Sequence, residues 1–359
     1  MMKNFPEGNA IVYCQDAFNT PNGKTAHGLV RKTARYSVLS VVDSTYAGKD
    51  AGLVLDGAPK NIPIIGDVAE AVEHAARQQR RATHLVIGLA PDGGRLNPRA
   101  RQDVKRAIEL GLNVDCGLHD FLSDDPEISG LAVKHRITLR DVRKTPTRDK
   151  LHFFDGRIEQ VTSLKIAVLG TDSAIGKRTT AWILVEGFRA AGYTAEMVGT
   201  GQTAWMQGAQ YSLILDSLIN DFVSGEIEFA VWSAWNDKKP DVIVIEGQGS
   251  LMNPAYPGGY EILAAARPDV VVLQHAPARV DYDGFPGYRI HPLDRQIKAI
   301  EIISEKPVVA ITINHESLQP DDLAPIYAEI EKAAGCVASD VLVDGPRKVI
   351  AALETYLKK

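Results

Sequence analysis

Cysteine is scarce in this sequence, which argues against both a disulfide framework and a cysteine-ligated zinc site. The 359 residues include only three cysteines, Cys14, Cys116 and Cys336, which lie far apart. An odd number at such spacing excludes a disulfide framework and indicates a reducing compartment. The three also lack the close spacing of zinc ligands, so we predict no resident metal site.

Long hydrophobic runs are absent as well. No stretch approaches the roughly 20 apolar residues of a membrane span, and the opening MMKNFPEGNA lacks the apolar centre of a signal peptide. A net charge of −5 argues against the basic surface that nucleic-acid-binding proteins carry. We therefore expect a cytoplasmic protein whose partners are small molecules, with neither nucleic acid nor membrane among them. Whether it forms a homo-oligomer stays open.

The composition that remains is that of a globular α/β protein. Hydrophobic residues make up 45% of the chain and charged residues 24%. Short apolar runs alternate with helical stretches, a pattern typical of parallel sheets covered by helices. Because 359 residues are many for a single core, we predict two α/β domains.

The first domain is predicted to span residues 1–145. Its expected strands are 10–14, 36–43, 84–90, 112–116 and 136–142, and its expected helices include 68–81, capped by Asp67, and 98–110. No G-x-G-x-x-G sequence follows the first strand. A nicotinamide cofactor in this domain is therefore poorly supported.

The second domain is predicted to span residues 146–359, after a charged linker over 143–160. Its expected strands are 164–170, 194–199, 241–246, 269–275, 307–314 and 338–344. Its expected helices are 177–191, 222–236, 292–304, 321–333 and 345–357. Again the alternation predicts a parallel sheet.

A phosphate-binding loop is predicted at GTDSAIGKRTT, residues 170–180. It lies between an apolar strand and a helix, where backbone N–H groups converge and the helix dipole favours an anion. Lys177 would add a positive charge for the phosphates. The residues expected to bind the ligand here are Gly170, Thr171, Asp172, Ser173, Ala174, Ile175, Gly176, Lys177, Arg178 and Thr179.

The loop departs from the pattern of nucleotide hydrolases at one place. Arg178 follows the lysine, where a hydrolase has a serine or threonine for magnesium, and Thr179 comes one place late. Asp172 is unusual in an anion site and would bind either Lys177 or a magnesium ion. The sequence leaves the magnesium requirement open.

Two further segments belong with this loop. PDVIVIEGQGS, residues 240–250, is a strand that ends in Glu246, and an acidic residue at that place faces the phosphates. Asn314 ends another strand, where it would either bind an adenine or cap a turn. The combination resembles the branch of phosphate-loop proteins that includes dethiobiotin synthetase.

A closer resemblance covers nearly the whole chain. It rests on GKTAHGLVR (23–31), GTDSAIGKRTTA (170–181), GTGQT (199–203), LDSLINDFVSGEIE (215–228) and IEGQGSLMNPAYPG (245–258). These segments resemble a family long described as a domain of unknown function, with a Rossmann-like N-terminal domain and a P-loop NTPase-like C-terminal domain. A characterised type in that family is a D-glutamate N-acetyltransferase. The resemblance implies transfer of acetyl from acetyl-CoA to a D-amino acid, with D-glutamate as the expected substrate.

Acetyl transfer to an amine needs a base, and a dicarboxylate substrate needs cations. Glu246 is the first candidate for the base, although a metal-binding or loop-orienting role is equally open to it, and Asp216 is the second. Lys177 completes the catalytic set. The candidate substrate contacts are Arg279, Arg289, Lys24, Gln248 and Ser250, and ion pairs with neighbouring aspartates are the alternative for the arginines. The alternative function is that of an ATP- and magnesium-dependent ligase or kinase of the dethiobiotin synthetase type.

Overall fold

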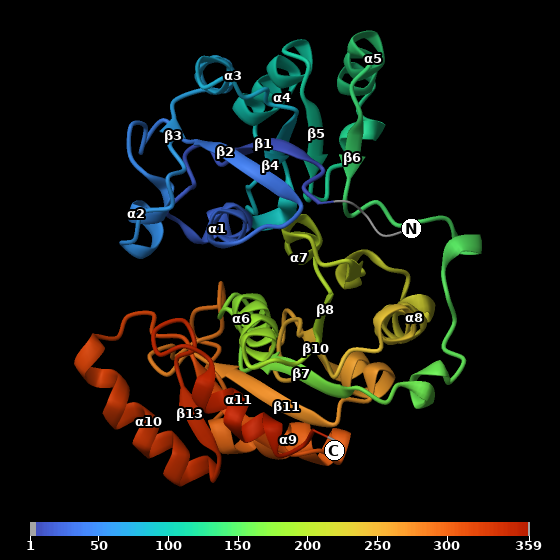
Figure 1. The fold of residues 1–359 in the computed structure, drawn as a ribbon, viewed down its shortest axis with the longest axis vertical. Coiled ribbons are helices and arrows are strands. Elements are labelled where there is room, and N and C mark those ends of the chain that lie inside the picture. The colour runs from blue at the N-terminus through green and yellow to red at the C-terminus, as the bar shows by residue number, and fades with distance from the viewer. Residues whose placement is uncertain (1–4, 358–359) are drawn as a thin grey trace. The chain divides into compact units, whose positions relative to one another are not determined.

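The computed structural model describes residues 5–357 and divides them into two compact units (Figure 1). The first unit runs to Thr145 and also includes Gln202–Gly208. The second unit comprises Pro146–Gly201 and the chain from Ala209 onward. The predicted division after residue 145 did not anticipate that a segment of the second half belongs to the first unit.

The first unit is built on a parallel sheet of six strands in the order β3-β2-β1-β4-β5-β6. The strands are β1 (Gly8–Tyr13), β2 (Tyr36–Val42), β3 (Ile64–Ile65), β4 (His84–Ile87), β5 (Asn113–Cys116) and β6 (Leu139–Asp141). The direction of strand addition reverses between β1 and β4, which is the order of a Rossmann fold. The predicted Rossmann-like domain is confirmed.

Within the described residues, six α-helices belong to this unit. They are α1 (Lys24–Arg31), α2 (Ala51–Asp56), α3 (Val68–Arg77), α4 (Pro98–Glu109), α5 (Pro126–His135) and α7 (Gln202–Gln207). The Asp67 carboxylate accepts a hydrogen bond from the Glu70 N–H, so the predicted cap of α3 is confirmed.

Helix α7 is held in the first unit by polar contacts. Gln207 donates from Nε2 to the carbonyl oxygens of Gly28 and Lys32, at 2.8 and 3.0 Å. The Arg35 Nε donates to the carbonyl oxygen of Trp205 at 2.7 Å, and the guanidinium lies 3.7 Å from the centroid of the Trp205 ring. These bonds explain why a short helix from the second half of the sequence packs with the first.

The second unit is built on a parallel sheet of seven strands in the order β13-β12-β11-β7-β10-β8-β9. The strands are β7 (Leu164–Gly170), β8 (Ala195–Gly199), β9 (Tyr211–Ser212), β10 (Val242–Glu246), β11 (Val270–His275), β12 (Val308–Ile313) and β13 (Val337–Ser339). Every residue of β7, β10 and β12 is buried, as in a sheet covered on both faces.

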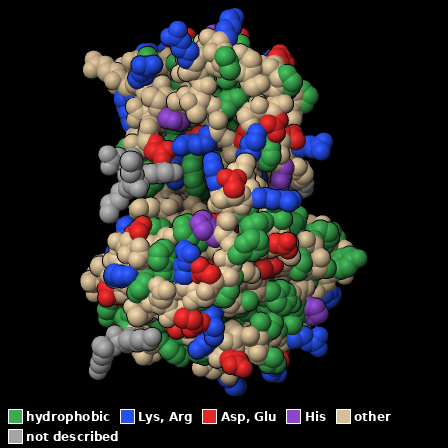
Figure 2. All heavy atoms as spheres, turned by 90° about the vertical axis from the view of Figure 1, so that its right-hand side faces the viewer, with side chains coloured by type: hydrophobic (Ala, Val, Ile, Leu, Met, Phe, Trp, Pro, Cys, Tyr) green, Lys and Arg blue, Asp and Glu red, His purple; other side chains and the backbone are tan. Residues whose placement is uncertain are grey.

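The helices of the second unit are α6 (Lys177–Ala190), α8 (Asn220–Lys238), α9 (Leu293–Ser304), α10 (Pro320–Ala334) and α11 (Arg347–Glu354), with a π-helical turn at Ile262–Ala266. The linker is fixed rather than loose, because the buried Glu228 of α8 accepts the N–H groups of Asp155 and Ile158. None of the helices within residues 5–357 combines the length and the apolar character that a bilayer crossing requires. On the face shown in Figure 2, basic, acidic and hydrophobic side chains are interspersed.

Candidate functional site

The turn between β7 and α6 has the backbone of a phosphate-binding loop. Gly176 has a φ of 101°, which side-chain-bearing residues rarely adopt. A Cβ atom at Gly170 would lie 2.8 Å from the Cδ of Lys177 and 3.0 Å from its Nζ. Gly170 therefore makes room for the lysine to fold back over the loop, where Nζ donates to the carbonyl oxygen of Asp172 at 2.6 Å.

The loop presents backbone donors at the start of α6. Among the hydrogen bonds that the described residues make, none uses the N–H groups of Ala174, Ile175 or Gly176. These groups precede the first turn of a 14-residue helix, whose dipole points its positive end at them. Together with the buried Lys177 they form a site suited to a phosphate group.

Of the two threonines after Arg178, Thr180 has its hydroxyl bonded inside the second unit. The Thr180 Oγ1 donates to the Oε1 of Gln274 at 2.5 Å, and Thr312 donates to the same oxygen at 2.6 Å. Thr180 is thus committed to the core, and Thr179 is half-buried. Among the residues that the structure describes, no three His, Cys, Asp or Glu side chains gather as a metal-binding group.

Asp172 is a buried centre that ties several loops to the phosphate loop. Its Oδ1 accepts the Ser173 N–H at 2.7 Å and the Asn253 amide at 2.8 Å. Its Oδ2 accepts from Arg279 at 2.8 Å and from the Asp283 N–H at 2.9 Å. Four donors occupy the carboxylate, so its role here is to hold loops together rather than to face a ligand.

Arg279, the first candidate for a substrate carboxylate, lies between two carboxylates of the protein. Its Nε and Nη2 donate to Glu316 at 2.6 and 2.8 Å, and its Nη1 donates to Asp172 and to the carbonyl oxygen of Ser173. These partners differ from the neighbouring aspartates that the sequence offered as the alternative. Arg279 acts as a brace between the phosphate loop and the end of β12.

Glu246 ends β10 and is buried beside the phosphate loop. Its Oε2 accepts the Thr200 N–H at 2.9 Å, and the Thr200 hydroxyl donates to its carbonyl oxygen at 3.0 Å. Burial raises the pKa of this carboxyl above its usual value, while the charge of Arg178, the Thr200 N–H and the charge of Lys177 oppose the rise. A carboxylate with a raised pKa is suited to accept a proton near neutral pH.

Asp216, the second candidate base, is exposed. It lies in the short turn Leu215–Ser217, which is joined to Thr200 because the Leu215 N–H donates to the Thr200 carbonyl oxygen at 3.0 Å. The turn that carries Asp216 and the side chain of Glu246 thus both bond to Thr200.

Gln248 and Ser250 follow Glu246 in the loop after β10. Gln248 donates to the Thr200 hydroxyl at 2.9 Å, which adds a third member to the group around Glu246. The buried Ser250 shapes the turn, because its N–H donates to the Tyr256 carbonyl oxygen at 3.2 Å and its hydroxyl to Gln296 at 3.4 Å. Both residues lie in the site region, and Ser250 has a clear structural part there.

Asn314 and His275 border the loop on its other side. The Asn314 Nδ2 donates to the Ile175 carbonyl oxygen at 3.2 Å and to Glu316 at 3.3 Å, and its Oδ1 accepts the Glu316 N–H. The His275 Nδ1 lies 3.0 Å from the Thr171 hydroxyl, and burial lowers the pKa of the ring to about 4. His275 is therefore neutral at physiological pH.

The remaining candidate cations are exposed. Lys24 is the first residue of α1 in the first unit, and its neighbour Thr25 is buried with its hydroxyl 2.9 Å from that of Thr203. Arg289 lies in the long connection after β11, and its side chain makes no ion pair with another residue in the described part of the chain. Of the two, Arg289 shares a unit with the phosphate loop.

Sequence reasoning missed several members of the site. Three polar residues hydrogen-bond the predicted ones: Thr200 bonds to Glu246, Asn253 to Asp172, and Glu316 to Arg279. Thr200 and Asn253 lie inside GTGQT and GQGSLMNP, segments that were already singled out, so polar residues in those segments were the available signal. Glu316 lies two residues past Asn314 and had no comparable signal.

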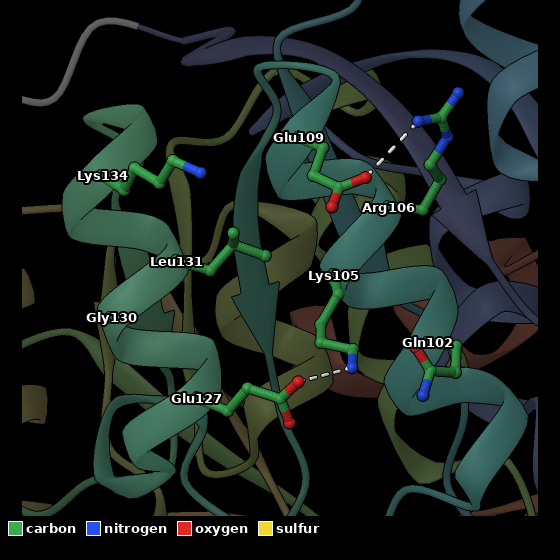
Figure 3. Close-up of a pocket in the computed structure, with 8 residues that line it drawn as sticks. All are labelled: Gln102, Lys105, Arg106, Glu109, Glu127, Gly130, Leu131 and Lys134. Carbon is green, nitrogen blue, oxygen red and sulfur yellow. Dashed lines mark hydrogen bonds and ion pairs between the residues drawn. The ribbon is translucent and has the colours of Figure 1, made fainter.

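A groove with a charged lining lies in the first unit. It encloses about 450 Å³ between α4 and α5 and is lined mainly by charged side chains (Figure 3). Lys105 pairs with Glu127 at 2.7 Å, and Arg106 pairs with Glu109 at 3.4 Å. Lys134 adds a further positive charge to the lining of the groove.

Comparison with known proteins identifies the family and the fold of this chain. Two relatives, from Tritonibacter scottomollicae and a Pseudoalteromonas species, are each 29% identical over 76% of this chain and 81% of their own length, and both are named D-glutamate N-acetyltransferase. The crystal structure of a DUF1611 family protein from Anabaena variabilis is similar with a TM-score of 0.88 and 26% identity, covering 97% of this chain and all of that one. The model of the DUF1611 P-loop domain matches residues 152–350, and that of the DUF1611 Rossmann-like domain matches residues 44–145. The chain therefore belongs to the DUF1611 family.

Proposed function

We propose that this protein is an N-acetyltransferase that moves the acetyl group of acetyl-CoA to the amino group of a D-amino acid, with D-glutamate as the expected substrate. The names of the two relatives support the reaction class. The observation that carries the proposal is the arrangement around the phosphate loop. Backbone donors of Ala174, Ile175 and Gly176 lie next to Lys177, and a buried Glu246 lies beside that lysine.

The donor fits the chemistry of this loop. Coenzyme A contains a diphosphate, which the N–H groups and Lys177 would hold by charge-assisted hydrogen bonds. No phosphate bond breaks during acetyl transfer, so the reaction does not depend on a magnesium hydroxyl at position 178. An arginine there instead adds positive charge next to Glu246.

The transfer itself needs one proton acceptor. The substrate nitrogen forms a bond to the thioester carbonyl carbon, the carbon–sulfur bond breaks, and the nitrogen gives up a proton while the departing thiolate gains one. We assign the acceptor role to Glu246, whose raised pKa suits it. Asp216 is the alternative acceptor, and Arg289 is the proposed contact for a substrate carboxylate.

The decisive experiment is a thiol-release assay with the purified protein, acetyl-CoA and a panel of D- and L-amino acids. We expect free thiol to appear with D-glutamate and N-acetyl-D-glutamate to accumulate in equal amount. A protein that releases no thiol with any amine but hydrolyses magnesium-ATP in the presence of a substrate would instead be a ligase or kinase of the dethiobiotin synthetase type. Release with L-amino acids alone would keep the reaction and correct the substrate.

A further inference from the structure

Three aromatic side chains gather on the loops that follow β10 and β11. The ring centroids of Tyr256 and Phe285 are 6.3 Å apart with the planes at 69°, and those of Phe285 and Tyr288 are 6.4 Å apart at 83°. Both contacts are edge-to-face, so the rings form a connected group rather than a closed stack. We call these three residues the aromatic group.

The aromatic group is anchored to the phosphate loop through Asp172. Asn253 donates to the Asp172 carboxylate and accepts the N–H of Tyr256 at 2.9 Å. On the other loop, the Asp283 N–H donates to the same carboxylate, two residues before Phe285. One buried side chain of the phosphate loop therefore holds both loops that carry the rings.

The loop that carries two of the rings is ordered by its own hydrogen bonds. The Tyr282 N–H donates to the Tyr288 carbonyl oxygen at 2.9 Å, and the Phe285 N–H donates to the Tyr282 carbonyl oxygen at 2.9 Å. The Gly287 N–H donates to the Asp281 carboxylate at 2.8 Å. The backbone that carries the two rings is thus ordered before any ligand arrives, which reduces the entropy lost on binding.

The outer members of the aromatic group are open to solvent. Tyr256 is 54% exposed and Tyr288 is 60% exposed. Large exposed rings beside a binding loop are suited to contact a ligand that has an apolar face. A purine has such a face, and stacking on tyrosine or phenylalanine is a common way to hold one.

Asn314, the candidate adenine contact at the end of β12, already has its amide bonded to the protein. Both amide hydrogens of Asn314 are directed at protein oxygens, those of Ile175 and Glu316, and its Oδ1 accepts a backbone N–H. Reading a base would require these bonds to break. The aromatic group needs no such rearrangement.

We propose that the aromatic group is a stacking surface for the adenine ring of the acetyl donor, whose diphosphate lies on the phosphate loop. This inference rests on the proposed function, since it identifies where that donor's base binds. The pantetheine arm is a poorer occupant because it has no flat π surface to stack.

The test measures donor fragments separately by competition calorimetry. Acetyl-CoA and ADP contain the adenine, and 4′-phosphopantetheine does not. For Tyr256→Ala and Tyr288→Ala we expect the affinity for acetyl-CoA and ADP to fall by roughly 5- to 100-fold per lost stacking contact, and that for 4′-phosphopantetheine to stay unchanged. Tyr288→Phe should restore binding, because the ring and not the hydroxyl makes the contact.

Tyr356 supplies the matched control. It is 41% exposed and lies past the end of α11, near Glu354, which interacts with Tyr193 in the turn after α6. That turn leads into the amino end of β8, whereas the phosphate loop follows the carboxyl end of β7 in the same parallel sheet. Tyr356→Ala should therefore bind all three ligands as the wild type does.

Each other outcome overturns the inference in a distinct way. Unchanged acetyl-CoA affinity in both alanine variants removes the aromatic group from the donor site, even if the wild type transfers acetyl normally. A loss for acetyl-CoA and 4′-phosphopantetheine, with ADP affinity unchanged, assigns the surface to the pantetheine arm. A change in the sedimentation coefficient of the variants, without a change in affinity, makes the surface a contact between copies of this chain. A wild type that neither binds acetyl-CoA nor releases thiol overturns the proposed function together with this inference.

Discussion

Each unit has a turn that leads from a central strand of its parallel sheet into a helix, β1 to α1 in the first and β7 to α6 in the second. The two turns differ in how their backbone N–H groups are bonded. In the first unit, the turn between β1 and α1 bonds several of its own donors: the Phe18 N–H bonds to the Asp43 carboxylate at 2.9 Å, and those of Ala17 and Gly23 bond to carbonyl oxygens within the turn. In the second unit, Ala174, Ile175 and Gly176 keep their N–H groups out of the hydrogen bonds of the described residues. The second turn therefore presents a run of adjacent donors at a helix start, which suits it to an anion.

The acid at the neighbouring strand end accounts for this difference. Asp43 follows β2 and is buried, and it accepts N–H groups from the first turn and from Thr45. Glu246 ends β10 and is also buried, but it accepts its N–H from Thr200, which lies outside the phosphate loop. Topology therefore decides where a ligand could bind, and the partners of one carboxylate decide whether the turn is available.

The largest effect is expected from Glu246→Gln. The amide keeps the size and the hydrogen bond from Thr200 but cannot accept the amine proton, so we expect the rate of acetyl transfer to fall roughly 100- to 10,000-fold. Acetyl-CoA affinity should change little. Because burial raises the pKa of the Glu246 carboxyl, the acid limb of the wild-type rate profile should lie above the usual pKa of glutamate and disappear in the variant.

Two companion variants sharpen this result. Asp43→Asn alters the corresponding acid of the first unit and should keep a normal rate and pH profile. Asp216→Asn alters the exposed alternative base. A loss of rate in Asp216→Asn, with Glu246→Gln near normal, would transfer the role of proton acceptor to Asp216.

The next effect concerns stability and comes from Asp172→Asn. The change leaves Arg279 without one of its two carboxylate partners in a buried place, so we expect the free energy of unfolding to fall by about 3–5 kcal/mol. Urea unfolding followed by tryptophan fluorescence measures this well, since Trp182, Trp232 and Trp235 all lie in the second unit.

Asp43→Asn is again the matched change. Asp43 accepts two backbone N–H groups and pairs with no cation among the described residues, so its replacement should cost about 1 kcal/mol. Equal losses in the two variants would show that Asp172 is no more central to its unit than Asp43 is to the other.

Lys177→Ala is expected to weaken the donor without unfolding the protein. Loss of a charge-assisted contact to the phosphates should reduce acetyl-CoA affinity by on the order of 1.5–3 kcal/mol, measured by calorimetry. Lys24 has the corresponding place at the start of α1, and Lys24→Ala should leave donor affinity within about twofold, because the Gly23 N–H directly before it is bonded to the Thr20 carbonyl oxygen. Unchanged affinity in Lys177→Ala would reject the role assigned to the phosphate loop.

The sequence predicted those parts of the fold that depend on local patterns. Apolar runs located the longer strands, and the glycine–lysine pair after β7 located the phosphate loop, because a turn and a helix start need little beyond their own residues. Strands β3 and β9 were missed, since two residues each carry no recognisable pattern.

Long-range partners were the part that local patterns could not supply. Arg279 pairs with Asp172 and Glu316, which lie 107 and 37 residues away, rather than with the aspartates next to it. Helix α7 packs with the first unit because Arg35, 170 residues earlier, bonds to Trp205. Such pairs form only after the sheet has brought the strand ends together.

The smallest expected effect is a loss of stability at acidic pH, which can be assigned to one unit or the other through a buried histidine in each. His84 in the first unit and His275 in the second each lie beside a threonine hydroxyl, and burial lowers the pKa of both rings, that of His275 to about 4. Between about pH 6.5 and about pH 4 the unfolded chain binds a proton at His275 that the folded protein does not. The stabilisation from the neutral ring is therefore complete above this range and is lost as the pH drops through it.

With allowance for the partial exposure of the ring, the loss of unfolding free energy between about pH 7 and about pH 5 should be on the order of 1–2 kcal/mol. Urea unfolding at both pH values should show a shallower dependence in His275→Asn than in the wild type, and His84→Asn provides the comparison in the first unit. Identical dependences in His275→Asn and the wild type would mean that the ring takes up its proton as readily in the folded protein as in the unfolded chain.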